Sequence, residues 1–211
     1  MSPVPPIRVA LADDQAILRS GLAALLRLER GLEVVGEAAT CADALAMVER
    51  ERPDVLLLDV QMPSGGGPEA PADGLEVAER LRGGSTRIIV LTTFGRAGYL
   101  RRTLETGASG FMVKDAPVEQ LVDAIRRVHQ GLRVVDPELA AQSLATGPNP
   151  LTPKESEVLR AAAQGGSTAQ IAARVFLSEG TVRNHISNAI GKLGVTNRAE
   201  AVREATDNGW L

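Results

Sequence analysis

Short runs of apolar residues alternate with helix-like stretches through the first two thirds of the chain. The runs suited to buried strands are residues 7–11, 32–38, 55–59, 88–92 and 109–113. Between them, apolar residues recur at helical spacing around residues 17–26, 44–48, 75–81, 99–104 and 121–128. Strands that are buried on both faces read as continuous apolar runs, as VLLLD does at 55–59. The pattern predicts an α/β fold, a five-stranded doubly wound parallel sheet with helices on both faces and right-handed crossovers.

The pattern changes after about residue 131. The next segment ends in Thr-Gly-Pro-Asn-Pro, a composition typical of a linker. Beyond it no strand pattern remains, and four short helices are predicted. Thr152, Pro153 and Glu155 form a typical helix start, and Ser178 opens a later helix. We therefore expect a first domain at 1–131, a linker at 132–149 and a small all-α domain at 150–211.

Composition is that of an ordinary globular protein. Hydrophobic residues make up 44% of the chain and charged residues 23%, which excludes a disordered, collagen-like or rod-like protein. No apolar run approaches the roughly 20 residues that span a bilayer, and the N-terminus does not resemble a signal peptide. Cys41 is the only cysteine, so neither an internal disulfide nor a cysteine metal site is expected. A reducing cytoplasm is the expected location.

Charge alone does not indicate a nucleic-acid-binding protein. The net charge is −3, and residues 151–211 carry seven Lys or Arg against six Asp or Glu. Phosphate contacts dominate affinity for DNA, so one copy of so weakly basic a domain should bind DNA weakly.

Acidic and polar side chains follow several of the predicted strands. They are Asp13, Asp14, Asp59, Thr92 and Lys114. In a doubly wound sheet the carboxyl ends of the strands form the ligand-binding edge, where these groups would converge. Three carboxylates in one pocket repel each other, and a divalent cation such as Mg²⁺ relieves that conflict. A carboxylate with Mg²⁺, a hydroxyl and an ammonium is equipped to receive a phosphoryl group.

Plainer explanations exist for each of these residues taken singly. An Asp-Asp pair after a strand is often a helix N-cap, and a Lys-Asp pair is often a solvated turn. Their combination at four different strand ends favours the chemical interpretation.

Residues 7–131 resemble the flavodoxin-like receiver domain of a bacterial two-component response regulator. The similarity lies in VALADDQ, VLLLDVQMP, VLTTF and ASGFMVKD. The resemblance implies that Asp59 is the phosphoacceptor, that a sensor histidine kinase is the phosphoryl donor, and that Thr92 and Lys114 contact the phosphoryl group. It further implies a Mg²⁺ site made by Asp13, Asp14, Asp59 and the backbone carbonyl of Gln61. Phe111 matches the aromatic residue whose rotation, together with Thr92, accompanies activation. Thr92 is preferred to Thr93 because it aligns with the strand end.

This receiver-like segment departs from the family pattern in two places. Asp115 follows Lys114 where many receivers have proline, and the loop Ser64–Asp73 is longer than the usual connection. The plainer interpretation of the loop is a tolerated surface insertion. The alternative hypothesis is that it alters access of water or of the kinase to Asp59.

The second domain resembles the helix-turn-helix of NarL/LuxR-type regulators. The similar segments are LTPKESEVLRAAAQG, IAARVFLSEGTVRNHISNAIGKLGV and NRAEAV. The expected core residues are Ile171, Ala172, Val175, Leu177, Val182, Ile186 and Leu193. The resemblance makes residues 179–192 the recognition helix in the major groove of double-stranded DNA. Arg183, Asn184 and Ser187 would meet base edges, with Thr181, His185 and Lys192 nearer to phosphates. Packing for His185, and a helix-dipole role for Lys192, are the alternatives.

Together these expectations describe a DNA-binding transcriptional regulator that phosphorylation switches on, rather than an enzyme. Phosphorylation would favour a homodimer that pairs two helix-turn-helix units on two-fold related half-sites. The helical segments 17–25 and 121–128 are one expected dimer surface, and the face between the fourth and fifth receiver helices is another. The last helix, 198–208, has small residues suited to pairing DNA-binding domains: Ala199, Ala201, Val202 and Ala205.

Two rival functions remain at this stage. An aspartate-nucleophile phosphatase needs a second Asp two residues after the first, but Gln61 stands there. A phosphorylation-independent DNA-binding regulator would require an inactive receiver.

Overall fold

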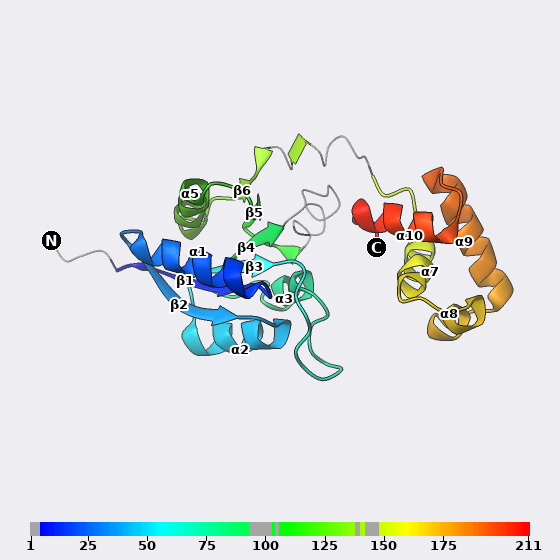
Figure 1. The fold of residues 1–211 in the computed structure, drawn as a ribbon, viewed down its shortest axis with the longest axis horizontal. Helices are drawn as coiled ribbons and strands as arrows, with labels where there is room; N and C mark the ends of the chain where they lie inside the picture. The colour runs from blue at the N-terminus through cyan, green and yellow to red at the C-terminus, as the bar shows by residue number, and fades with distance from the viewer. Residues whose placement is uncertain (1–4, 93–102, 104–105, 138–139, 142–147) are drawn as a thin grey trace. The chain divides into compact units, whose positions relative to one another are not determined.

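The structure is a computed structural model that describes residues 5–92, 103, 106–137, 140–141 and 148–211 (Figure 1). Its described residues divide into two compact units, the first ending at Ala140 and the second beginning at Ala141. Apart from residue 103, the helix predicted around 99–104 lies outside the described residues, and so does the alternative site residue Thr93. None of the described helices combines the length and hydrophobicity that crossing a bilayer requires.

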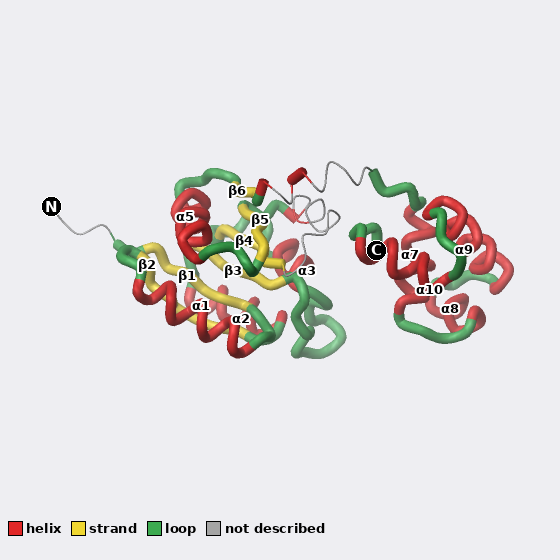
Figure 2. The backbone as a smooth tube through the Cα atoms, turned by 45° about the horizontal axis from the view of Figure 1, so that its top comes forward, coloured by secondary structure: helices red, strands yellow, loops and turns green. Residues whose placement is uncertain are grey.

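A parallel sheet with the strand order β2-β1-β3-β4-β5-β6 forms the centre of the first unit (Figure 2). Its strands are β1 (Ile7–Ala12), β2 (Leu32–Ala38), β3 (Val55–Asp59), β4 (Arg87–Thr92), β5 (Gly110–Val113) and β6 (Val134–Val135). The five predicted strands are confirmed. The sixth strand was not predicted, because two residues are too few to show a periodicity. It forms beside β5, where the N–H of Val134 donates to the carbonyl of Ser109.

Helices cover both faces of this sheet. They are α1 (Ala16–Leu28), α2 (Cys41–Glu51), α3 (Gly74–Arg80) and α5 (Val118–His129). Residues of α1 and α5 pack with Val55 and Leu57 in one apolar cluster. Leu56 and Leu58 are equally buried and point to the opposite face, because side chains alternate along a strand. β3 is therefore buried on both sides, which explains its unbroken apolar sequence.

Residues 148–211 of the second unit form four helices, as predicted. They are α7 (Pro153–Ala163), α8 (Thr168–Arg174), α9 (Glu179–Leu193) and α10 (Arg198–Asp207). Thr152 and Glu155 form the predicted capping box of α7, and Ser178 caps α9 through the N–H of Thr181. Two apolar clusters fill the interior and include all seven residues expected in the core: Ile171, Ala172, Val175, Leu177, Val182, Ile186 and Leu193.

Candidate functional site

Polar side chains from three strands meet at the carboxyl edge of the sheet. The Nζ atom of Lys114 lies 2.7 Å from Oδ2 of Asp13 and 2.8 Å from Oδ2 of Asp59. Asp13 follows β1, Asp59 ends the neighbouring β3, and Lys114 follows β5. All three side chains are less than one tenth exposed. The parallel topology thus brings together groups that are far apart in the chain.

Burial and charge set the protonation of this cluster. Burial raises the pKa of the Asp59 carboxyl above its ordinary value, although Lys114 acts in the opposite direction. Burial by itself would lower the pKa of Lys114, but the ion pairs with Asp13 and Asp59 raise that pKa overall. Lys114 is therefore held as a cation, and a second cation near Asp59 would favour its carboxylate form.

Asp14 completes an acidic group at this edge. One carboxylate oxygen from each of Asp13, Asp14 and Asp59 can be chosen so that all three lie within 4.8 Å of one another. Neither Asp13 nor Asp14 caps α1, whose N-cap residue Gln15 has no side-chain cap bond. The cap interpretation of the Asp-Asp pair is therefore wrong. Hard oxygen donors this close together, two of them buried, fit a magnesium ion.

The segment after Asp59 is held close to its carboxylate. The N–H of Gln61 donates to Oδ1 of Asp59 at 3.2 Å, so the Gln61 peptide lies beside the acidic group. Gly74 opens α3 so close to β3 that a Cβ atom would lie 1.9 Å from the carbonyl oxygen of Asp59. Only glycine permits this approach, which fixes the start of α3 against the strand end.

Thr92 and Phe111 lie on the two strands next to the acidic cluster. Thr92 ends β4 with 5% of its surface exposed, and its carbonyl accepts the backbone N–H of Lys114 at 2.8 Å. Phe111 in β5 pairs in register with Val90 of β4 and is 1% exposed. In this structure Phe111 is thus a core residue, and Thr92 lies at the cluster's edge.

The long loop is anchored on α2. The N–H groups of Cys41 and Ala42 donate to the carbonyls of Pro63 and Ser64 at 2.9 and 3.0 Å. Gly65 has a φ of +70°, and a Cβ there would lie 2.2 Å from Oγ1 of Thr40. Cys41 lies beneath this contact, where burial, together with Asp73, Glu76 and Asp59, raises the pKa of its thiol to about 11. The loop carbonyls thus accept hydrogen bonds from N–H groups in the first turn of α2, which have no partner within the helix.

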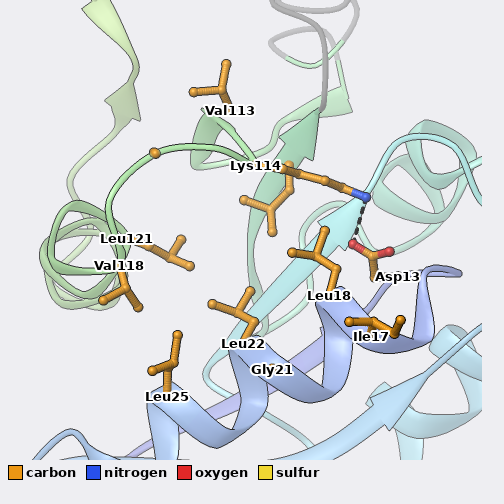
Figure 3. Close-up of a pocket in the computed structure, with 12 residues that line it drawn as sticks. Asp13, Ile17, Leu18, Gly21, Leu22, Leu25, Val113, Lys114, Val118 and Leu121 are labelled. Atoms are coloured by element: carbon orange, nitrogen blue, oxygen red, sulfur yellow. Dashed lines mark ion pairs between the residues drawn. The ribbon is translucent and has the colours of Figure 1, made fainter.

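An apolar groove of about 380 Å³ runs between α1 and α5 and reaches the acidic cluster (Figure 3). Asp13 and Lys114 line one end of it. Its walls carry Ile17, Leu18, Leu22 and Leu25 of α1 with Val118 and Leu121 of α5. Ile17 is 92% exposed and Leu25 is 48% exposed. Exposed apolar residues beside a groove are typical of an association surface.

The helix α9 presents a polar face to solvent. Arg183, Asn184 and Ser187 are exposed, while Thr181 and His185 are half-buried. Thr181 shares a 2.8 Å hydroxyl contact with the cap residue Ser178. Asn188 is also exposed, one turn beyond Asn184, and sequence reasoning missed it although the spacing of four residues was visible.

Lys192, at the far end of α9, is engaged inside the unit. Its Nζ lies 2.7 Å from Oε2 of Glu155, whose side chain is 4% exposed. Burial would raise the pKa of Glu155, but hydrogen bonds from Lys192 and Thr152 lower it overall. The positive charge of Lys192 is therefore partly balanced within the unit, which the sequence did not indicate.

Family models match both units. The response regulator receiver domain matches residues 9–126, and the luxR family of bacterial regulatory proteins matches residues 149–205. The chain belongs to the response regulators with a luxR-type domain. This response regulator is 42% identical over 205 residues to the transcriptional regulatory protein DesR of Bacillus subtilis, covering 97% of this chain and 99% of DesR. It is 36% identical over 210 residues to the DNA-binding transcriptional activator DevR/DosR of Mycobacterium tuberculosis, covering 95% and 94% of the two chains.

Solved structures agree with this assignment. The response regulator ChrA of a heme-sensing two-component system has a TM-score of 0.58 and 32% identity, covering 99% of this chain and all of that one. The RcsB–DNA complex has a TM-score of 0.66 and 27% identity, covering 96% and 98%. This response regulator is therefore a DNA-binding transcription regulator, and its curated relatives are regulators rather than enzymes.

Proposed function

We propose that this response regulator is switched by transfer of a phosphoryl group from a sensor histidine kinase to Asp59. The observation that supports this most is the position of Lys114, buried between Asp13 and Asp59 at the carboxyl edge of the sheet. A buried ammonium shared by two carboxylates is an arrangement suited to stabilising a third, incoming anion.

In the proposed transfer, an Oδ atom of Asp59 attacks the phosphorus of the kinase's phosphohistidine. A P–O bond forms, the P–N bond breaks, and the imidazole leaves with the electron pair. Lys114 and the hydroxyl of Thr92 bind the phosphoryl oxygens. Asp13, Asp14, Asp59 and the carbonyl of Gln61 would hold Mg²⁺, which neutralises negative charge on the transferring group when bound.

The proposed output is a homodimer. Asp13 and Lys114 line one end of the groove between α1 and α5. Movement of these two side chains around the acyl phosphate would therefore change the shape of the groove. Thr92 and Phe111 are the proposed switch residues that carry this rearrangement. Two copies can bury the exposed apolar side chains of α1 in each other's groove, a self-complementary contact with two-fold symmetry.

The dimer would then place two copies of α9 on two-fold related half-sites of DNA. Arg183, Asn184 and Ser187 are proposed to read bases, with Thr181, His185 and Lys192 nearer to phosphates. The second unit has little net positive charge, because residues 151–211 carry seven Lys or Arg against six Asp or Glu. One copy should therefore bind DNA weakly, and pairing of two copies is needed for tight binding. A cytoplasmic location belongs to this proposal, because DNA and the kinase's phosphohistidine are both met there.

Beryllofluoride, which mimics an acyl phosphate in the presence of Mg²⁺, tests the switch. We expect it to convert the full chain to a dimer in size-exclusion chromatography and to tighten DNA binding in the same samples. The Asp59→Asn variant should show neither change. A full chain that binds DNA equally well with and without beryllofluoride would instead be the phosphorylation-independent regulator.

A further inference from the structure

A strained backbone turn between α8 and α9 carries an exposed aromatic ring. Phe176 has a φ of +53°, and its side chain is 93% exposed. Among the described residues, only Phe176 and Arg52 adopt a positive φ without being glycine. The left-handed conformation is energetically unfavourable for a bulky residue. A ring exposed to solvent buries no apolar surface within the unit, so nothing in the unit offsets this strain.

The turn itself does not require an aromatic residue. The N–H of Leu177 donates to the carbonyl of Ala172 at 3.0 Å, the bond that closes a helix around one left-handed residue. The same bond closes three other helices of this chain, from Leu132 to Arg127, from Val195 to Ile190 and from Trp210 to Ala205. In those three turns the left-handed residue is a glycine: Gly131, Gly194 and Gly209. Among the described helices that end in this bond, Phe176 alone takes the place of a glycine.

The neighbours of Phe176 explain why its ring faces solvent. Val175 is 6% exposed, and Leu177 packs against the same apolar cluster, so both sides of the turn are anchored in the core. The ring lies two residues before Ser178, the N-cap of α9. In helix-turn-helix proteins this end of the recognition helix is the one that approaches base edges.

We propose that Phe176 is a DNA-contacting residue that packs its ring against an apolar group of the duplex, a thymine methyl or a deoxyribose. The proposal rests on the DNA-binding role of the second unit. The ring is uncharged, so its contact adds affinity that does not depend on counterion release. In a unit with so small a net positive charge, such a contact adds affinity that charge alone does not supply.

The test compares DNA binding by the wild-type chain and by the full-length Phe176→Gly variant, both activated by beryllofluoride. The probe is a duplex of about 20 base pairs, long enough for two half-sites, that the wild-type chain selects from a random library. We expect Phe176→Gly to weaken binding about tenfold while leaving the slope of affinity against salt concentration unchanged. Its thermal midpoint should not fall, because glycine relieves the strain and no buried contact is lost.

Two further variants serve as controls. Phe176→Tyr keeps the ring and should bind within about twofold of the wild type. Arg52→Gly makes the same backbone change at the end of α2 and should leave DNA binding unaltered. A probe with uracil in place of thymine lacks the methyl group but keeps the deoxyribose. Weaker binding to this probe would identify the methyl group as the contact, and unchanged binding would identify the deoxyribose.

Three results would overturn the proposal. The first is Phe176→Gly binding as tightly as the wild type. The second is a loss of binding together with a lower thermal midpoint, which would make the ring a packing residue. The third is a change of oligomeric state without DNA, which would make a second copy the partner. If the wild-type chain selects no duplex at all, the DNA-binding role fails as well, so the two failures are distinguishable.

Discussion

Nζ of Lys114 lies 2.8 Å from Oδ2 of Asp59, although Lys114 follows β5 and Asp59 ends β3, two strands that are not adjacent in the sheet. β4 lies between those strands, so the long lysine side chain has to reach across its end. Asp59 is consequently a buried carboxylate whose charge is balanced by a neighbour rather than by water.

The first prediction concerns divalent cations. Burial raises the pKa of Asp59 even though Lys114 opposes this shift, so the carboxylate is still stabilised less than in water when no metal ion is bound. We expect Asp59→Asn to raise the thermal midpoint of the first unit in the presence of a chelator. Mg²⁺ should then stabilise the wild type but not the variant, because ligand binding stabilises only the state that binds it. Asp115→Asn, an exposed neighbour of Lys114, is the matched control and should respond to Mg²⁺ like the wild type. Equal stabilisation of Asp59→Asn by Mg²⁺ would contradict the proposed site.

The second prediction concerns the groove between α1 and α5. Ile17 is 92% exposed and lines the groove, whereas Leu28 is 80% exposed on the same helix but is not part of its lining. Ile17→Lys should abolish the beryllofluoride-induced dimer in size-exclusion chromatography, because it places a charge in a contact that must lose water. Leu28→Lys should leave the dimer intact. Neither variant should lower stability by more than about 0.5 kcal/mol, since both side chains are at the surface. A dimer that survives Ile17→Lys would move the interface to another face.

The third prediction concerns the tip of the long loop. Gly66 and Ala70 lie side by side, and the N–H of Ala70 donates to the carbonyl of Gly67. Deleting Gly67, Pro68 and Glu69 should therefore shorten the tip without disturbing the anchors at Pro63 and Ser64. If the tip screens Asp59 from water or from the kinase, the deletion will change the rate of phosphorylation or the lifetime of the acyl phosphate. Both rates are measurable with labelled phosphoryl donor, and two unchanged rates would make the tip a tolerated insertion.

The fourth prediction concerns the pair Lys192 and Glu155. Lys192→Met leaves a buried carboxylate without its partner, and we expect it to lower the unfolding free energy of the second unit by about 2 kcal/mol. The loss should be much smaller in a Glu155→Gln background, because glutamine keeps the capping box and carries no charge. Urea unfolding of the wild type, the two single variants and the double variant measures this coupling. An effect on DNA affinity alone, with unchanged stability, would support the phosphate-contact role of Lys192 instead.

The fifth prediction is the pH dependence of the same unit. Folding lowers the pKa of Glu155 below its ordinary value of 4.5, so the ionised group contributes stability above that value. The contribution is lost as the pH falls below 4.5 and through the lowered folded-state pKa. We expect the urea midpoint of the second unit to fall over this range, and to fall less in Glu155→Gln. Identical pH profiles for the two proteins would show that Glu155 does not titrate as described.

Most of the strands and helices, and the residues that meet at the strand ends, could be predicted from the sequence. Periodicity is local, so five strands, the helix caps at Thr152 and Ser178, and the strand-end positions of Asp13, Asp59 and Lys114 could be read directly. The parallel topology then follows from alternating strands and helices, and it requires strand ends to share one edge. β6 escaped prediction because its two residues become a strand only beside β5.

Tertiary structure alone decided which side chains meet and which stay in solvent. The pairing of Lys192 with Glu155 joins α9 to α7, and the anchoring of the loop joins Ser64 to α2. Neither contact could be predicted from the spacing of residues in the sequence, because each depends on how separate elements pack. The exposure of Phe176 is likewise invisible in the sequence, because it is as apolar as its neighbours Val175 and Leu177, which pack in the core. Burial is a property of the packed chain, and a pattern of apolar residues cannot say which of them the fold leaves uncovered.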